Sequence, residues 1–214
     1  MEEGYPGNLD VTVTYTLSNT NEFKIEYMAT TDKSTVCNLT NHNYYDLSGQ
    51  GIRDDNDNQL MINADHYTLV DEDLITSGKI EPVWGTPLDF TRIKRIGAHI
   101  DDDDTQLKYG GGHDHNWVLN KKSDEMSLAA KVYQKTSGRI MEIYTIDPGL
   151  QFYSGHFLDG TLVGKGGKAC KNRYPFCLET PHFPDSPNKP DFPSIILRRG
   201  QKYHTKTGHT FSTK

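Results

Sequence analysis

The sequence has few cysteines, no excess of basic residues and no long apolar run. Three cysteines, Cys37, Cys170 and Cys177, are too few and too irregularly spaced for a disulfide framework or a zinc ribbon. We therefore expect them to be buried thiols in a reducing compartment. Lys and Arg total 23 against 29 Asp and Glu, and the resulting formal charge of −6 disfavours nucleic acid and anionic membranes as partners.

No segment approaches the apolar length that is needed to cross a bilayer, and the acidic start MEEGYPGNLD lacks the apolar centre of a signal peptide. The expected location is therefore the cytoplasm. The length of 214 residues suits one domain with a substantial core, so we expect residues 1–214 to form a single domain.

Alternation of apolar and polar residues predicts an all-β fold. Leu9–Leu17 alternates strictly, which predicts a strand with one buried face, and residues 23–27 alternate after a polar turn, which predicts a hairpin. Shorter runs, separated by Gly, Asn, Asp and Pro, occur at 35–39, 60–64, 117–119, 128–133, 140–145, 151–153, 174–178 and 195–197. Many short strands with turns between them indicate an antiparallel sandwich or barrel.

Helical spacing is rare in this sequence. Ile93, Ile96 and Ile100 lie about one turn apart, which predicts a short helical connector that Gly97 weakens. The acidic run 101–104 lacks the alternating ligands and the closing Glu of a calcium loop. A solvated loop is therefore the favoured interpretation of that run.

Glu179 is the first candidate for a functional role. It follows the apolar run 174–178, and the prolines after it end the strand, so Glu179 should lie at the edge of the core. Burial there raises the pKa of a carboxyl group toward the value that suits a general base near neutral pH. An ordinary ion pair with Arg or Lys explains the same position equally well.

Two further polar clusters lie next to apolar runs. In NLTNHNYYDLSG, residues 38–49, His42 and Tyr44 share one face by the strand period of two, although a structural histidine is the simpler interpretation of His42 alone. In GGHDHNWVL, residues 111–119, His113 and His115 flank Asp114. Metal binding is the less favoured interpretation of this trio, because local spacing fixes no third ligand. Hydrogen bonding of Asp114 to substrate or backbone explains it as well.

Together these clusters resemble the aldose 1-epimerase, or galactose mutarotase, family. Similar stretches run in the family's order from Glu2 to Gly200: EEGYPGNLDVTVTY, NLTNHNYYDLSG, GTPLDFTRIKRIG, GGHDHNWVL, SGRIMEIYTIDPGLQFYSG and CLETPHFPDSPNKPDFPSIILRRG. The resemblance implies a large antiparallel β-sandwich of the galactose mutarotase type. It also implies a small-molecule substrate, since the family interconverts the α and β anomers of free aldoses such as galactose and glucose.

The resemblance also assigns roles to five residues. Glu179 would be the general base and His42 the general acid, Asp114 and Gln151 would bind sugar hydroxyls, and Tyr44 would line the pocket. One base and one acid suffice to open and close a sugar ring. The implied reaction therefore requires neither a metal nor a nucleotide cofactor.

The chain departs from the family pattern in residues and in length. Asp46, Pro181 and His156 stand where Asn, Gln and Asn are usual, which would alter substrate preference. Family members also carry a further N-terminal portion, roughly the first third, so we expect an N-terminally truncated sandwich with an open sugar site and an exposed edge that favours self-association. A non-catalytic sugar-binding module is the alternative function, but the presence of both Glu179 and His42 favours the enzyme.

Overall fold

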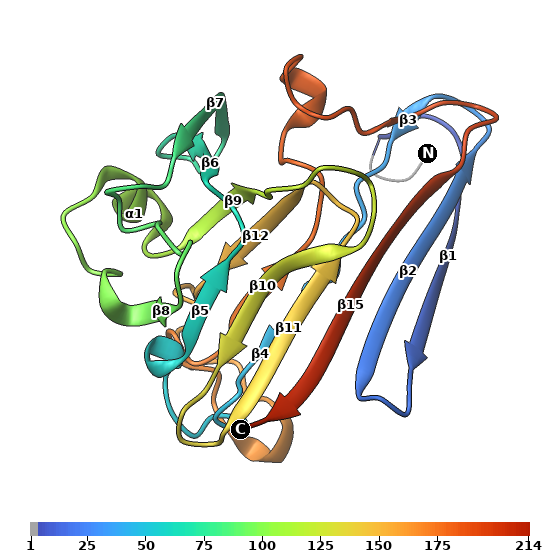
Figure 1. The fold of residues 1–214 in the computed structure, drawn as a ribbon. Helices are drawn as coiled ribbons and strands as arrows, with labels where there is room; N and C mark the ends of the chain where they lie inside the picture. The colour runs from blue at the N-terminus through green and yellow to red at the C-terminus, as the bar shows by residue number, and fades with distance from the viewer. Residues whose placement is uncertain (1–3) are drawn as a thin grey trace.

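Antiparallel strands make up most of the regular secondary structure, as a computed structural model that describes residues 4–214 shows (Figure 1). A seven-stranded sheet has the order β1-β2-β15-β11-β10-β5-β8, a six-stranded sheet has the order β4-β13-β12-β9-β6-β7, and β14 pairs with β3. The strands are β1 (Leu9–Leu17), β2 (Glu22–Thr31), β3 (Thr35–Val36), β4 (Tyr44–Tyr45), β5 (Gln59–Ile62), β6 (His66–Val70), β7 (Thr76–Pro82), β8 (Lys94–Arg95), β9 (Asp114–Val118), β10 (Ser127–Tyr133), β11 (Arg139–Thr145), β12 (Gly149–Tyr153), β13 (Phe176–Glu179), β14 (Ile196–Leu197) and β15 (Tyr203–Thr213). The predicted all-β class is confirmed.

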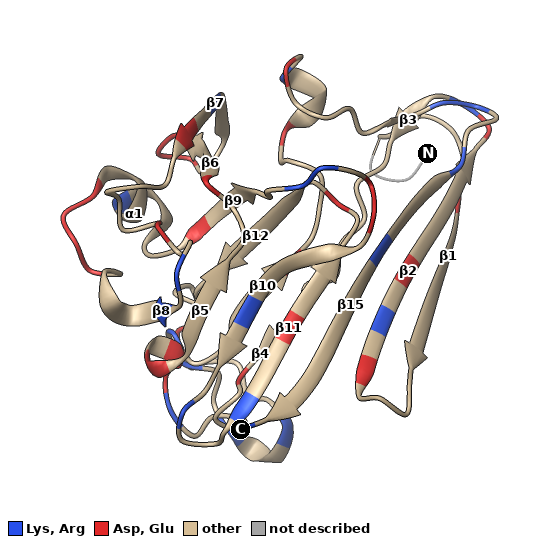
Figure 2. Cartoon of the chain, in the orientation of Figure 1, with Lys and Arg blue, Asp and Glu red and all other residues tan. Residues whose placement is uncertain are grey.

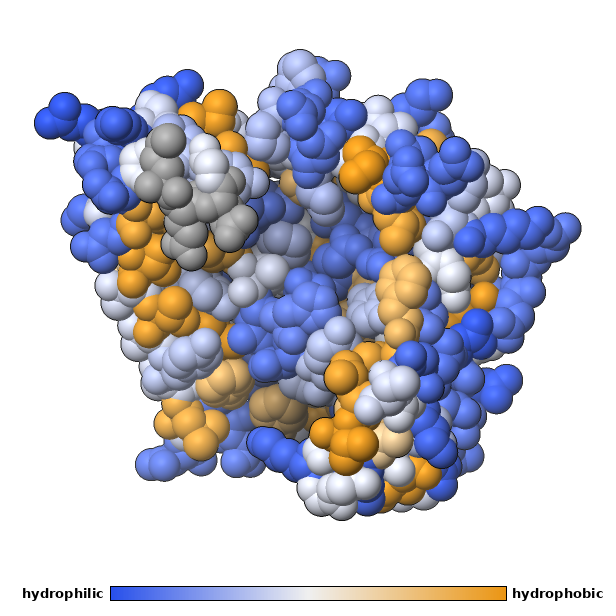
Figure 3. Space-filling model, turned by 180° about the vertical axis from the view of Figure 1, so that it is seen from behind, coloured by the Kyte–Doolittle hydropathy of each residue, from blue (hydrophilic) through white to orange (hydrophobic). Residues whose placement is uncertain are grey.

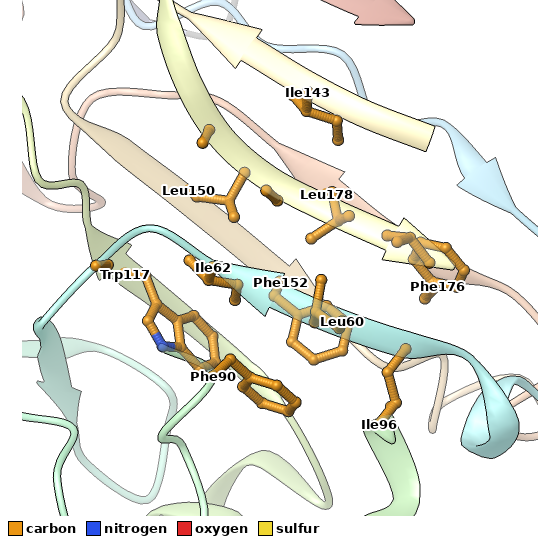
Figure 4. Close-up of a cluster of buried hydrophobic side chains, with 14 of the residues drawn as sticks. Leu60, Ile62, Phe90, Ile96, Trp117, Ile143, Leu150, Phe152, Phe176 and Leu178 are labelled. Carbon is orange, nitrogen blue, oxygen red and sulfur yellow. The ribbon is translucent and has the colours of Figure 1, made fainter. Parts of the chain in front are cut away.

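The core lies between the two large sheets (Figure 4). Leu60, Ile62 and Ile143 of the seven-stranded sheet share one buried cluster with Phe152 and Leu178 of the six-stranded sheet. Burying such a side chain stabilises the fold by roughly 1.5–3 kcal/mol. Alternate residues of each strand point into this cluster, so the intervening residues of the same strands are free to face the other way.

The hairpin of β1 and β2 is confirmed, but the buried face expected for β1 is wrong. The two strands pair antiparallel from Leu9 opposite Thr31 to Leu17 opposite Phe23. All nine residues of β1 are exposed, and Leu17 is 76% exposed. The reason is position, because β1 is the edge strand of the large sheet and extends beyond the smaller sheet (Figure 1).

The expected helical connector at Ile93–Ile100 is also wrong. The chain there forms β8 and a three-residue 3₁₀ turn, η2 (Ile96–Ala98), because Ile96 and Ile100 are buried by tertiary packing rather than along one helix face. The helix in this part of the chain is α1 (Thr105–Gly110). The carboxylate of Asp104 caps it by accepting hydrogen bonds from the backbone N–H groups of Gln106 and Leu107, so the end of the acidic run has a structural role.

Charged residues of both signs are interspersed along the outer face of the large sheet (Figure 2). Lys131 Nζ, for example, lies 2.9 Å from Glu142 Oε1 of the neighbouring strand. Mixed charge of this kind keeps a sheet face in water without creating a basic surface for polyanions. The outer face of the large sheet therefore offers no basic surface for a polyanion.

Candidate active site

The predicted site residues lie on the face of the six-stranded sheet that points away from the core. On β12, Leu150 and Phe152 point into the core, so Gln151 and Tyr153 point outward. Gln151 pairs with Glu179 of β13 on one side and with Asn116 of β9 on the other. The next row of the same face contains Asp114, Tyr153, Cys177 and Tyr44. Strand register thus brings together residues that are far apart in the sequence.

Glu179 is the last residue of β13 and is only 8% exposed. Burial raises the pKa of its carboxyl group to about 7, the nearby Asp114 carboxylate acts in the same direction, and His42 opposes both. Among the residues that the structure describes, no Lys or Arg forms an ion pair with Glu179. The alternative of an ordinary ion pair with Arg or Lys is therefore wrong. A buried carboxyl group whose pKa is raised to about 7 is suited to proton transfer near neutral pH.

His42 lies directly opposite Glu179. Its Nε2 atom is 3.4 Å from Oε1 of Glu179, and half of its side chain is exposed. The imidazole packs against Tyr44 at a centroid distance of 5.1 Å and against Tyr153 at 6.3 Å. A group that can give a proton and a group that can take one therefore face the same space, at a distance over which a sugar hydroxyl can contact each of them.

Asp114 and Gln151 form a hydrogen-bonded pair on the same face. Gln151 Nε2 donates to Asp114 Oδ1 at 2.8 Å, while Gln151 Oε1 is buried without a partner. Burial raises the pKa of Asp114, and the Gln151 amide and His42 partly offset that rise. Fixed carboxylate and amide groups with spare hydrogen-bonding capacity are suited to bind the hydroxyls of a sugar.

The two histidines beside Asp114 do not join this group. His113 and His115 are fully buried on the core side of β9, where the His113 ring packs 5.1 Å from Phe90 and 5.3 Å from Phe152. Burial lowers the pKa of His115 to about 4. Within residues 4–214, no three His, Cys, Asp or Glu side chains converge as metal ligands. Alternation along β9 places Asp114 on the opposite face from His113 and His115, so these three side chains do not converge.

Two residues of this face were missed from the sequence, namely Tyr153 and Asn116. Tyr153 contacts both His42 and Tyr44, and Asn116 is buried with both amide atoms unpartnered beside Gln151. The period of two provided the signal for both, since Tyr153 shares a face with Gln151 and Asn116 shares a face with Asp114. Both residues are therefore part of the candidate active site.

Seen from behind, the molecule is hollowed, and mainly hydrophilic residues line the hollow (Figure 3). A cavity of about 610 Å³ adjoins the site at Tyr44 and is bordered by Gln50, Leu158, Lys168 and Tyr174. Glu179 and Asp114 are not among the residues that line this cavity. The cavity therefore adjoins the candidate site at Tyr44 and does not contain the acid and base pair.

The Aldose 1-epimerase family model matches residues 1–210, and the chain belongs to this family. Galactose mutarotase from Rattus norvegicus is 47% identical over 99% of this chain, and aldose 1-epimerase from Escherichia coli K12 is 39% identical over 98% of it. The chain spans about 60% of the length of these relatives.

Solved structures agree with the family assignment. An aldose epimerase homologue from C. elegans has a TM-score of 0.85 at 30% identity, covering 99% of this chain and 62% of that one. Galactose 1-epimerase from Lactobacillus acidophilus has a TM-score of 0.83 at 28% identity, covering 98% and 58%. The fold predicted from the resemblance is confirmed as that of the galactose mutarotase type.

Two findings bear on the environment of the protein. No helix within the described residues is long and apolar enough to cross a membrane. Cys37, Cys170 and Cys177 are all free thiols; Cys37 and Cys177 are buried as predicted, but the prediction is wrong for Cys170, which is only partly buried. Burial raises the pKa of Cys37 to about 11. A thiol with so high a pKa is mostly protonated near neutral pH and therefore reacts slowly.

Proposed function

We propose that this chain is an aldose 1-epimerase that interconverts the α and β anomers of free aldoses such as galactose and glucose. The observation that carries the proposal is the distance of 3.4 Å between His42 Nε2 and Glu179 Oε1 on a face that also holds Asp114 and Gln151. The relatives named galactose mutarotase and aldose 1-epimerase support the same reaction.

In the proposed mechanism, Glu179 accepts the proton of the C1 hydroxyl while His42 donates a proton to the ring oxygen. The C1–O5 bond breaks, and the open aldehyde rotates about the C1–C2 bond. The reverse transfers then close the ring on the other face of C1, so both groups recover their starting protonation states. Each positioned proton transfer typically contributes about 10²- to 10⁴-fold to the rate.

Binding of the sugar in this proposal falls to Asp114, Gln151 and Tyr44. The Asp114 carboxylate and Gln151 Oε1 accept hydrogen bonds from ring hydroxyls. Tyr44, which is half exposed, covers one side of the ring. Hydrogen bonds from fixed polar groups orient the anomeric centre between the acid and the base. Tyr153, which lies against His42, extends the same wall.

Polarimetry of freshly dissolved α-glucose and α-galactose, with and without the protein, tests the proposal. Faster decay of optical rotation with the protein is the expected result. The second candidate is a non-catalytic sugar-binding module, and it is favoured by one observation, namely that the paired Asp114 and Gln151 can bind sugar hydroxyls without any proton transfer. Sugar binding by calorimetry without any change in the polarimetric rate would establish that candidate instead.

We further propose that the chain self-associates through β1. This edge strand exposes an apolar row, which is Leu9, Val11, Val13, Tyr15 and Leu17, and Asp10 is its only charged residue. Natural edges are usually protected by charges, prolines or bulges. In a two-fold antiparallel pairing centred on Val13, apolar residues of one copy meet apolar residues of the other, and Asp10 meets Thr16.

Sedimentation velocity over a range of concentrations tests the association. Val13→Lys places two like charges opposite each other at the centre of the pairing, so we expect this variant to stay monomeric. Thr30→Lys is the matched control, because Thr30 is exposed on β2 and leaves the edge unchanged. A wild-type protein that remains monomeric at all concentrations excludes the pairing.

The remaining proposals concern location and domain organisation. We propose the cytoplasm, which is supported by three free thiols and by the absence of a membrane-spanning helix among the described residues. We also propose that residues 1–214 fold as one domain. A single cooperative unfolding transition in circular dichroism and fluorescence is expected for one domain.

A further inference from the structure

The main-chain pairing that leads to the active site stops before it reaches the acid. The ladder between β4 and β13 contains two pairs, Tyr45 with Phe176 and Tyr44 with Cys177. His42 lies two residues beyond that ladder in a segment without regular structure, and half of its side chain is exposed. Neither strand pairing nor burial therefore accounts for the position of His42 opposite Glu179.

Side chains continue the pairing where the main chain stops. Asn38 Nδ2 donates to the carbonyl oxygen of His182 at 3.0 Å, and the N–H of His182 donates to Asn38 Oδ1 at 2.9 Å. The N–H of Thr180 donates to Thr40 Oγ1 at 3.2 Å. These three bonds join residues 38–40 to residues 180–182 in the same antiparallel sense as the ladder, on the far side of His42 and Glu179.

We call the three hydrogen bonds that join Asn38 and Thr40 to Thr180 and His182 the clamp. Its residues 180–182, which directly follow Glu179, are themselves anchored in the large sheet. The hydroxyl of Thr180 is hydrogen-bonded to that of Thr207 on β15, and both residues are buried. Nδ1 of His182 lies 3.3 Å from Oδ1 of the buried Asp147, although the two atoms lack hydrogen-bond geometry. Residues 180–182 are thus a fixed base onto which the segment that contains His42 is fastened.

We infer that Asn38 and Thr40 are positioning residues that hold the acid, His42, in register with the base, Glu179. This inference rests on the proposed epimerase function for its catalytic consequence, and on the hydrogen bonds alone for its structural one. Neither residue touches the reacting atoms in the proposed mechanism. They act by restricting the movement of a half-exposed histidine that packs against Tyr44 and Tyr153.

Loss of the clamp should reduce turnover more than binding. A misplacement of about 1 Å far from the chemistry can cost roughly 10²-fold in rate. Asp114 and Gln151 lie on β9 and β12 and do not contact the clamp, so sugar binding should persist. A fall in kcat of roughly 10- to 100-fold, with KM changed by less than about threefold, is therefore expected for Asn38→Ala and for Thr40→Val.

Two matched variants separate positioning from general stability. Thr40→Ser keeps the hydroxyl that accepts the bond from Thr180, so it should restore kcat toward the wild-type value. Asn63→Ala removes a similar bond, from Asn63 Nδ2 to the carbonyl oxygen of Leu128 at 3.0 Å, in the large sheet. It should reduce stability to a similar degree and leave kcat unchanged. If Asn38→Ala does not fold, Thr40→Val, which preserves side-chain shape, decides the question.

An NMR double-mutant comparison tests the clamp without any turnover. Because Nε2 of His42 lies 3.4 Å from the Glu179 carboxyl group, Glu179→Gln should shift the ring signals of His42 at a fixed pH. In combination with Asn38→Ala or Thr40→Val the same substitution should shift them much less, whereas combination with Thr40→Ser or Asn63→Ala should leave the shift unchanged. If the wild-type protein does not turn over sugar, the proposed function fails while this comparison still decides the clamp. The inference is overturned if Asn38→Ala and Thr40→Val keep the full shift and match Asn63→Ala in kcat.

Discussion

The two faces of the six-stranded sheet are made by neighbouring residues with opposite environments. Phe152 and Leu178 are buried against the large sheet, whereas Gln151 and Glu179, one position away, lie on the outer face with the candidate site. The inner face is closely packed and mostly apolar, apart from the buried His113 and His115, and the outer face holds polar groups that are only partly satisfied. Because alternate residues of a strand face opposite sides of the sheet, one side of this sheet contributes to stability and the other carries the candidate site.

The outer face carries an energetic cost at the candidate base. Glu179 is almost completely buried, and its raised pKa means that burial disfavours the charged form. Residues that serve a reaction often reduce stability in this way. Substitutions at adjacent positions of one strand should therefore affect different measured properties.

The largest effect is expected on the inner face. Phe152→Ala should lower the free energy of unfolding by about 3–5 kcal/mol, because it leaves a cavity at the centre of the buried cluster. Gln151→Ala, on the outer face, should cost only about 1 kcal/mol for one lost hydrogen bond. Urea denaturation measures both values. Equal losses for the two variants would remove the distinction between the faces.

The next effect concerns turnover on the outer face. Glu179→Gln keeps the shape of the side chain but cannot take a proton, so kcat should fall by about 10² or more, with KM largely unchanged. The free energy of unfolding should not decrease, because a buried charge has been removed. An unchanged polarimetric rate in this variant would falsify the proposed base.

Sugar binding should depend on Asp114. Asp114→Ala removes one partner for sugar hydroxyls and leaves the Gln151 amide unpaired, so binding should weaken by about 1–3 kcal/mol. Titration calorimetry with galactose measures the change. Asp124→Ala, an exposed carboxylate in the loop between β9 and β10, serves as the control and should bind as the wild type does.

The pH dependence of stability should differ between wild type and Glu179→Gln. The pKa of Glu179 is raised from 4.5 to about 7 by folding, so the folded state holds the extra proton within that range. The stabilisation that Glu179 gives to the folded state is fully present below pH 4.5 and is lost as the pH rises through about 7. Buried histidines such as His115, whose pKa falls to about 4, act in the opposite direction, so the difference between the two proteins isolates Glu179.

Much of the fold follows from alternation, and the exceptions have physical causes. The hairpin of β1 and β2 is evident because both strands alternate strictly. β15 was missed because Thr, His and Gly fill it, although its residues pair with two neighbouring strands over most of its length. The exposure of β1 has no signal in its sequence, since burial depends on what lies opposite a strand and not on the strand itself.

The candidate site was more predictable than its surroundings. Glu179 was identified from the apolar run before it, and His42, Tyr44 and Asp114 from polar clusters beside apolar runs. The resemblance assigned their roles and added Gln151. The orientation of His113 and His115 toward the core follows from the strand period, once β9 is known to begin at Asp114 instead of Trp117. The clamp of Asn38 and Thr40 could not be foreseen, because it joins segments about 140 residues apart.

The pH dependence of the polarimetric rate is the most direct test of the outer face as an acid and base site. Glu179 must be ionised to take a proton, and its pKa is raised to about 7, so the acidic limb of the pH profile for glucose mutarotation should have a midpoint near pH 7. The rate should fall again at higher pH, because His42 must be protonated to donate. The contribution of Glu179 to the free energy of unfolding should fall as the pH rises from 4.5 to about 7. A rate that is already constant from about pH 5 upward would contradict the account, because it would mean that the catalytic base is an ordinary exposed carboxylate.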